Sequence, residues 1–193
     1  MLIRSSLLAT LVLAACGGSP PLPEPAPGPD FIDADWRREH LVLPADFAPT
    51  MPSGTELLLF APGMFEAGAE DFWSYVFWMK VDQVNLDASQ LTELFELYYD
   101  GLVQAVAGDK GQDIGADLAS TITVTANGDG TYAMEIRVIE PFVTMESLDV
   151  HAEIQIVDTS DSATTLYVKA SPQPKSHWIW SHLEAAIQAA DFR

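Results

Sequence analysis

Four short segments between residues 121 and 170 constrain the fold of this chain most. Apolar and polar residues alternate within each of them. Residues 132–139 place Met134, Ile136 and Val138 on one side, which is the period of a half-buried β-strand. The sequence Asn-Gly-Asp-Gly at 127–130 is a strong hairpin turn signal. Strands of this kind predict an antiparallel sheet with one face in water. They are predicted at 121–126, 132–139, 148–157 and 164–170.

Two further strands are predicted nearer the N-terminus, at 55–61 and 72–82. The second of them has apolar residues on one side, from Trp73 to Val81, and also carries Val76 and Trp78 on the other. A strand that is apolar on both sides is typical of a position covered by two layers. We therefore expect 72–82 to be a central strand or a strand covered on both sides.

Two helices are predicted, at 88–107 and 176–190, and a short helix capped by Asp33 is predicted at 33–40. The first helix begins at a capping box formed by Asp87 and Gln90. Glycine inside a helix costs about 1 kcal/mol relative to alanine, so Gly101 weakens this prediction. The apolar stripe of the first helix is predicted at Leu91, Leu94, Phe95, Tyr98, Leu102 and Val106.

These elements predict an α+β domain. Its order is two strands, one helix, four strands and a second helix, which gives an antiparallel sheet of about six strands. Because hairpins outnumber helices, we expect the two helices to pack together on one face of the sheet.

The N-terminus has the composition of a secretory signal peptide. Arg4 precedes the apolar run LLATLVL at 7–13, which is too short to cross a bilayer, since crossing takes roughly 20 apolar residues. The run ends in Leu-Ala-Ala-Cys, and Cys16 is the only cysteine of the chain. Residues 1–15 are therefore predicted to be removed on export.

The sequence around Cys16 resembles the lipobox of bacterial lipoproteins. The resemblance implies that the Cys16 thiol carries a diacylglyceryl group and that the mature protein begins at Cys16. Two or more acyl chains hold a protein stably on a bilayer. Gly17 resembles the residue of lipoproteins that are moved to the outer membrane, which implies a lipid-anchored protein there. The alternative is an ordinary signal peptide with an unmodified cysteine.

Residues 16–30 are predicted to be a tether. Residues 17–30 contain six prolines and three glycines, a composition that favours an extended chain of about 3.1 Å per residue, or roughly 40 Å in all. Such a spacer would hold the domain off the membrane; the alternative is a proline-rich ligand for a partner domain. Residues 31–193 have the length of a single domain.

The charge of the chain is strongly negative. Removal of residues 1–15 takes away Arg4 and leaves 8 basic against 28 acidic residues, a formal charge of −20. A polyanion repels nucleic acid, so no nucleic-acid partner is predicted. Cationic partners, divalent ions and simple solubility are all compatible with this charge, and solubility is the plainest explanation.

The chain has no recognisable catalytic motif, so we predict a non-enzymatic envelope lipoprotein that binds an envelope protein or a glycan. Trp178 and Trp180 are two residues apart and cannot both face the core from one helix. One of them is expected to be exposed beside Lys175 and to bind the partner. The alternative is that the segment is extended and both indoles lie in the core or at its rim.

The second functional hypothesis is a small-ligand carrier or an enzyme, with a pocket between helix 88–107 and the sheet. No metal site and no cofactor are predicted. His177 and His182 are five residues apart and diverge by about 140° on a helix, which argues against a zinc pair. The candidate pocket residues are Tyr98, Tyr99, Asp100 and His151.

Overall fold

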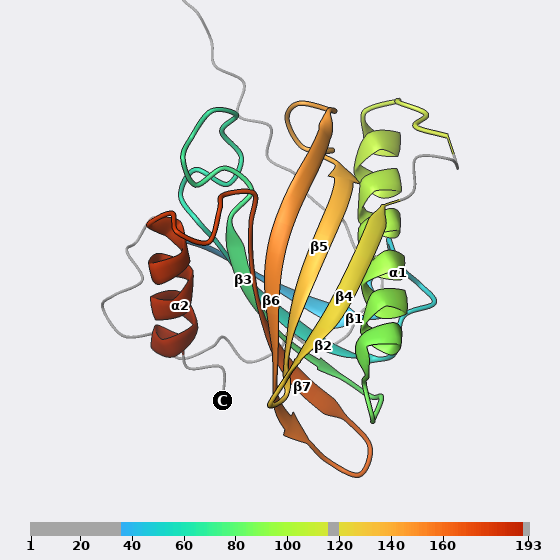
Figure 1. Ribbon diagram of the computed structural model, residues 1–193. Helices are drawn as coiled ribbons and strands as arrows, with labels where there is room; N and C mark the ends of the chain where they lie inside the picture. Colours follow the sequence, from blue (N-terminus) through green and yellow to red (C-terminus); the bar gives the residue numbers. More distant parts are fainter. Residues whose placement is uncertain (1–35, 116–119, 191–193) are drawn as a thin grey trace, which may run out of the picture.

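The computed structural model describes residues 36–115 and 120–190 (Figure 1). Within them, seven strands form one antiparallel sheet in the order β1-β2-β3-β7-β6-β5-β4. The predicted signal peptide 1–15 and tether 16–30, with Cys16, lie outside the described residues. The elements are β1 Arg37–Leu43, β2 Gly54–Phe60, β3 Tyr75–Val81, α1 Ala88–Asp109, β4 Thr121–Gly128, β5 Thr131–Ile139, β6 Ser147–Thr159, β7 Thr164–Ser171 and α2 Ile179–Ala189.

The six predicted strands are present, and the α+β class is confirmed. β4 and β5 form the hairpin predicted at the Asn-Gly-Asp-Gly turn, with Thr121 opposite Arg137. β3 lies inside the sheet between β2 and β7, as its two apolar faces predict. The chain thus forms two antiparallel units, β1–β3 and β4–β7, which join where β3 pairs with β7.

The predicted short helix at 33–40 is wrong over its described part, because residues Arg37–Leu43 form the edge strand β1. β1 pairs along its whole length with β2, and Leu41 lies opposite Glu56. Leu41 and Leu43 face the core, which alternation along a strand allows. Pairing with a buried neighbouring strand outweighs a local helix signal here, because it supplies both hydrogen bonds and apolar contact.

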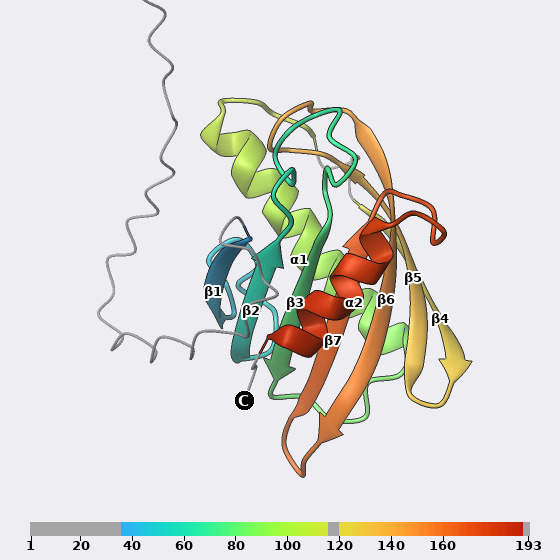
Figure 2. The same ribbon diagram turned by 90° about the vertical axis from the view of Figure 1, so that its left-hand side faces the viewer.

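The helices pack on opposite faces of the sheet, which corrects the prediction of one shared face. Leu58 and Phe77 belong to the core that α1 covers. Leu57 and Val76 belong to a second core that α2 covers. Figure 1 shows the sheet between the two helices, and Figure 2 shows α2 lying across it. The reason is that β2 and β3 are apolar on both faces, so each face needs a covering layer.

The capping box predicted for α1 is confirmed. The Gln90 backbone N–H donates to Asp87 Oδ1 at 3.0 Å, and the Asp87 backbone N–H donates to Gln90 Oε1 at 3.0 Å. The first half of the apolar stripe is also confirmed, but its second half is rotated by about one residue. The buried residues are Leu91, Leu94, Phe95, Tyr98, Tyr99, Val103 and Ala107, whereas Leu102 and Val106 are only partly buried.

A buried hydrogen-bonded carboxylate joins two loops. Trp73 lies before β3, in the loop that follows β2, and its indole Nε1 donates to Glu140 Oε1 at 3.1 Å. Backbone N–H groups of Phe142, Val143 and Thr144 donate to the same carboxylate. Burial opposes ionisation, but these donors lower the pKa of Glu140. Glu140 therefore has a structural role, and β3 begins at Tyr75 because residues 72–74 belong to this loop.

Candidate functional site

The turn between β7 and α2 presents an exposed indole. α2 begins at Ile179, not at the predicted residue 176, so Trp178 lies at the helix N-terminus. Trp178 is 41% exposed. Its Nε1 donates to Glu70 Oε2 at 3.4 Å, and Glu70 comes from the loop between β2 and β3. The Trp178 side chain is therefore exposed and also hydrogen-bonded.

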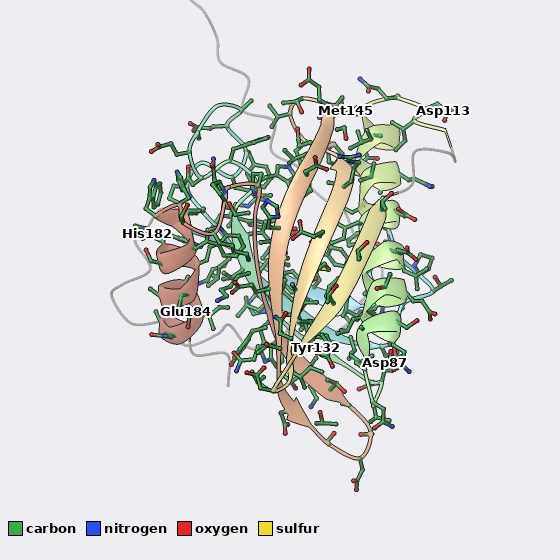
Figure 3. All side chains as sticks on the ribbon, viewed as in Figure 1. Asp87, Asp113, Tyr132, Met145, His182 and Glu184 are labelled. Atoms are coloured by element: carbon green, nitrogen blue, oxygen red, sulfur yellow. The ribbon has the colours of Figure 1, made fainter. Side chains whose placement is uncertain are left out.

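Two histidines flank this indole. The His182 ring meets the Trp178 ring edge-on, with centroids 4.8 Å apart. The His177 ring centroid lies 5.3 Å away, and His177 Nε2 lies 4.0 Å from Glu70 Oε1. Figure 3 shows His182 on α2, on the side away from the sheet. We refer to Glu70, His177, Trp178 and His182 as the Trp178 surface.

Trp180 is the buried member of the predicted pair. It is 8% exposed, and its Nε1 donates to the Gln173 carbonyl at 2.9 Å. The Lys175 ammonium lies 3.2 Å from the centroid of the Trp180 ring and 3.1 Å from Glu153 Oε1. Burial lowers the pKa of Lys175, although Glu153 acts in the opposite direction. Lys175 is exposed but is already engaged with Trp180 and Glu153, so of the two tryptophans Trp178 is the one that a partner can reach.

A second hydrogen bond fixes the loop that carries Glu70. The Gln173 side-chain amide donates to the Glu70 carbonyl at 3.0 Å. Sequence reasoning missed Glu70, because 108 residues separate it from Trp178. It argued against His177 and His182 as a zinc pair but did not connect either of them with Trp178. Within residues 36–115 and 120–190, no group of three or more potential metal ligands is assembled.

The four predicted pocket residues are not brought together. Tyr98 and Tyr99 are buried in the core under α1, where the Tyr99 hydroxyl lies 2.6 Å from the Tyr75 hydroxyl. Asp100 accepts from the Ser120 hydroxyl at 2.7 Å. His151 lies on the face of the sheet opposite α1, which we call the outer face. Its Nδ1 is 2.5 Å from Glu135 Oε2. The packed core thus separates His151 from the two tyrosines.

The outer face of the sheet has two shallow hollows. One, of about 260 Å³, lies between α2 and the sheet and includes Lys169 and Glu184. The other, of about 350 Å³, is lined by His151, Glu135 and the Arg137–Asp149 pair. In both, the charged side chains are already paired with each other. Each charged side chain that lines these hollows therefore already has a partner within the protein.

A carboxyl group is buried inside the core beneath α1. Glu56 of β2 is 1% exposed, and neither of its oxygens makes a hydrogen bond of ordinary geometry within the described residues. Burial raises the pKa of Glu56 to about 8; the Tyr98 hydroxyl acts in the opposite direction, and Glu39 adds to the rise. Glu56 is therefore largely protonated at neutral pH.

No protein-family model, curated protein or solved structure matches this chain. Within residues 36–115 and 120–190, no helix is long and apolar enough to cross a membrane.

Proposed function

We propose that this chain is a bacterial cell-envelope lipoprotein, anchored to the outer membrane through lipid on Cys16, whose acidic domain is a non-enzymatic binding module. The proposed partner is an envelope protein, and the proposed docking site is the Trp178 surface. The observation that carries this proposal is that Trp178 is 41% exposed and yet ordered. Its indole is held by a hydrogen bond to Glu70 and by a ring contact with His182. Partly exposed tryptophans that are already ordered bind partners at low entropic cost.

The position of the site fits a tethered domain. Trp178 lies at the start of α2, on the outer face of the sheet, while α1 covers the other face (Figure 2). A proline-rich spacer of roughly 40 Å would let this face reach a neighbouring envelope protein. The formal charge of −20 keeps the domain away from anionic headgroups.

The anchor predicts a specific covalent mass. Protein purified from a bacterium that processes lipoproteins is expected to begin at Cys16 and to exceed the mass of residues 16–193 by the diacylglyceryl and acyl groups. Intact-mass spectrometry measures this directly. Cys16→Ala should abolish the added mass, and Ser19→Ala should leave it unchanged. A different first residue, or an unmodified Cys16 thiol, would contradict the anchor.

The docking site predicts a selective loss of binding. Trp178→Ala is expected to reduce co-purification of the partner from native envelopes at least tenfold, because truncating a central aromatic anchor typically costs 2 kcal/mol or more. Its effect on the free energy of unfolding should stay below about 1 kcal/mol, since the side chain is exposed. Quantitative mass spectrometry of the captured proteins measures the first effect, and urea unfolding measures the second.

Leu97→Ala is the matched control. Leu97 is also 41% exposed, but it lies on α1, across the sheet from Trp178. This variant should retain the partner and remain folded. If the wild type, Trp178→Ala and Leu97→Ala capture the same proteins in the same amounts, the Trp178 surface is not the docking site.

A further inference from the structure

One tryptophan of this protein already binds a cation. The Lys175 ammonium lies 3.2 Å from the centroid of the Trp180 ring, and Glu153 Oε1 lies 3.1 Å from the same ammonium. The indole face attracts the positive charge, and the carboxylate pairs with it. An indole with a neighbouring carboxylate is thus a cation site that the fold itself fills.

Trp178 and Glu70 bring the same two kinds of group together at the surface, with the carboxylate at the N–H edge of the indole. The Trp178 Nε1 donates to Glu70 Oε2, so the carboxylate is held beside the indole. The Glu70 side chain is 75% exposed, and its ion-pair partner is His177, at 4.0 Å. Across residues 36–115 and 120–190, the cation–π contacts of Lys and Arg involve Trp180, Phe60 and Phe65, but not Trp178.

The charge of the chain favours an external cation at this position. The whole chain has 28 acidic and 9 basic residues. Lys169 and Lys175, which lie on this side of the domain, are already engaged: Lys169 contacts Glu153 and Glu184, and Lys175 contacts Glu153. A negative surface attracts cationic ligands and increases their rate of encounter. The structure therefore offers Trp178 and Glu70 to a basic group from outside the chain.

We propose that the Trp178 surface recognises a basic side chain, arginine or lysine, on its protein partner. The cationic group would lie against the exposed indole and pair with the Glu70 carboxylate, as Lys175 does with Trp180 and Glu153. This inference rests on the proposed function, since it names the chemistry of the partner at the same site. Arginine suits the site best, because its planar guanidinium both stacks on an aromatic ring and binds a carboxylate through two donors.

The test uses a defined peptide and the mature protein. The probe is the peptide acetyl-Gly-Ser-Arg-Ser-Gly-amide, and its neutral match carries citrulline in place of arginine. Titration is followed by the NMR signal of the Trp178 indole N–H, assigned by its loss in Trp178→Ala. We expect a saturable shift with the arginine peptide and at least threefold weaker binding of the citrulline peptide. Glu70→Gln should weaken binding of the arginine peptide at least threefold, and Leu97→Ala should leave it unchanged.

Other outcomes would overturn the inference. Equal shifts with the arginine and citrulline peptides would show that charge is not recognised. A shift with chitotriose, but none with the arginine peptide, would make the surface a glycan site. Glu70→Gln and Trp178→Ala are both exposed substitutions, so circular dichroism should confirm that each variant is folded.

The failure of this inference can be told apart from failure of the proposed function. If a partner is lost with Trp178→Ala but retained in full with Glu70→Gln, the surface docks a protein without a basic anchor. If the arginine peptide binds as expected but no partner depends on Trp178, the recognition chemistry stands and the docking proposal fails.

Discussion

Glu56→Gln is expected to make the protein more resistant to urea than the wild type at pH 8, and this advantage should shrink toward pH 5. The carboxyl group of Glu56 is 1% exposed, and neither of its oxygens makes a hydrogen bond of ordinary geometry within the described residues. A buried charge without a partner is strongly unfavourable, so the folded protein keeps the proton. Glutamine has nearly the same shape and carries no charge at any pH.

The sign of the effect follows from the two pKa values of Glu56. The ordinary pKa is 4.5, and burial raises it to about 8 in the folded protein. Below 4.5 both states hold the proton, and this group adds no pH dependence. Between 4.5 and 8 only the unfolded chain releases it, so the free energy of unfolding falls as the pH rises. Over this window the loss is on the order of 5 kcal/mol, and above pH 8 it grows no further.

The surroundings of Glu56 offer little that would stabilise its charge. Leu41 of β1 and Met79 of β3 are its neighbours across the strands. From α1, the Tyr98 hydroxyl favours the ionised form, whereas Glu39 of β1 disfavours it. Because Tyr98 is itself buried and its pKa is raised by burial and by Glu56, it stays protonated.

Urea unfolding at pH 5, 6, 7 and 8 measures this prediction, with the difference between variant and wild type taken at each pH. The difference cancels the contribution of the other titratable groups. Glu140, whose lowered pKa gives the opposite slope, acts only below its ordinary pKa of 4.5 and so outside this range. Glu93→Gln, an exposed substitution on α1, should follow the wild-type curve. Parallel curves for wild type and Glu56→Gln would show that Glu56 is not protonated in the folded protein.

The part of the fold that local sequence could predict is the part built from short-range signals. The Asn-Gly-Asp-Gly turn and the alternation around it specify the β4–β5 hairpin. The Asp87–Gln90 capping box specifies the start of α1. β1 was missed because it is held by pairing with β2, and its local residues give no strong strand pattern. The opposite placement of the helices depends on how β2 and β3 are covered, which no single segment reveals.

The candidate site was predictable only in part. Spacing alone indicated that one of Trp178 and Trp180 would be exposed, but the start of α2 at Ile179 decides which one. Glu70 could not be found, because a fold-level contact brings it to Trp178. The sequence does mark Glu56 as unusual, because it is an acidic residue at the start of the apolar segment 56–61. A charged residue beside a buried strand is worth examining as a perturbed carboxyl group.

Gly101→Ala is expected to destabilise the protein by about 2–3 kcal/mol, although helix propensity alone predicts a gain of about 1 kcal/mol. A Cβ added at Gly101 would lie 2.1 Å from the Phe47 carbonyl oxygen and 3.3 Å from the Ala48 Cβ. A contact with a backbone atom at that distance requires the loop between β1 and β2 to move. The Phe47 ring also packs edge-on against Tyr98, with centroids 5.3 Å apart, so movement would disturb the α1 core.

Gly108→Ala is the matched control for this prediction. Gly108 lies in the same helix, and a Cβ added there meets no atom within 4 Å. Helix propensity should then dominate, and the free energy of unfolding should rise by up to about 1 kcal/mol. Thermal unfolding of both variants measures the difference, which should appear as a decrease in Tm of roughly 5–10 °C for Gly101→Ala and a small increase for Gly108→Ala. If Gly101→Ala stabilised the protein as much as Gly108→Ala, the loop around Phe47 would not lie against α1 as described.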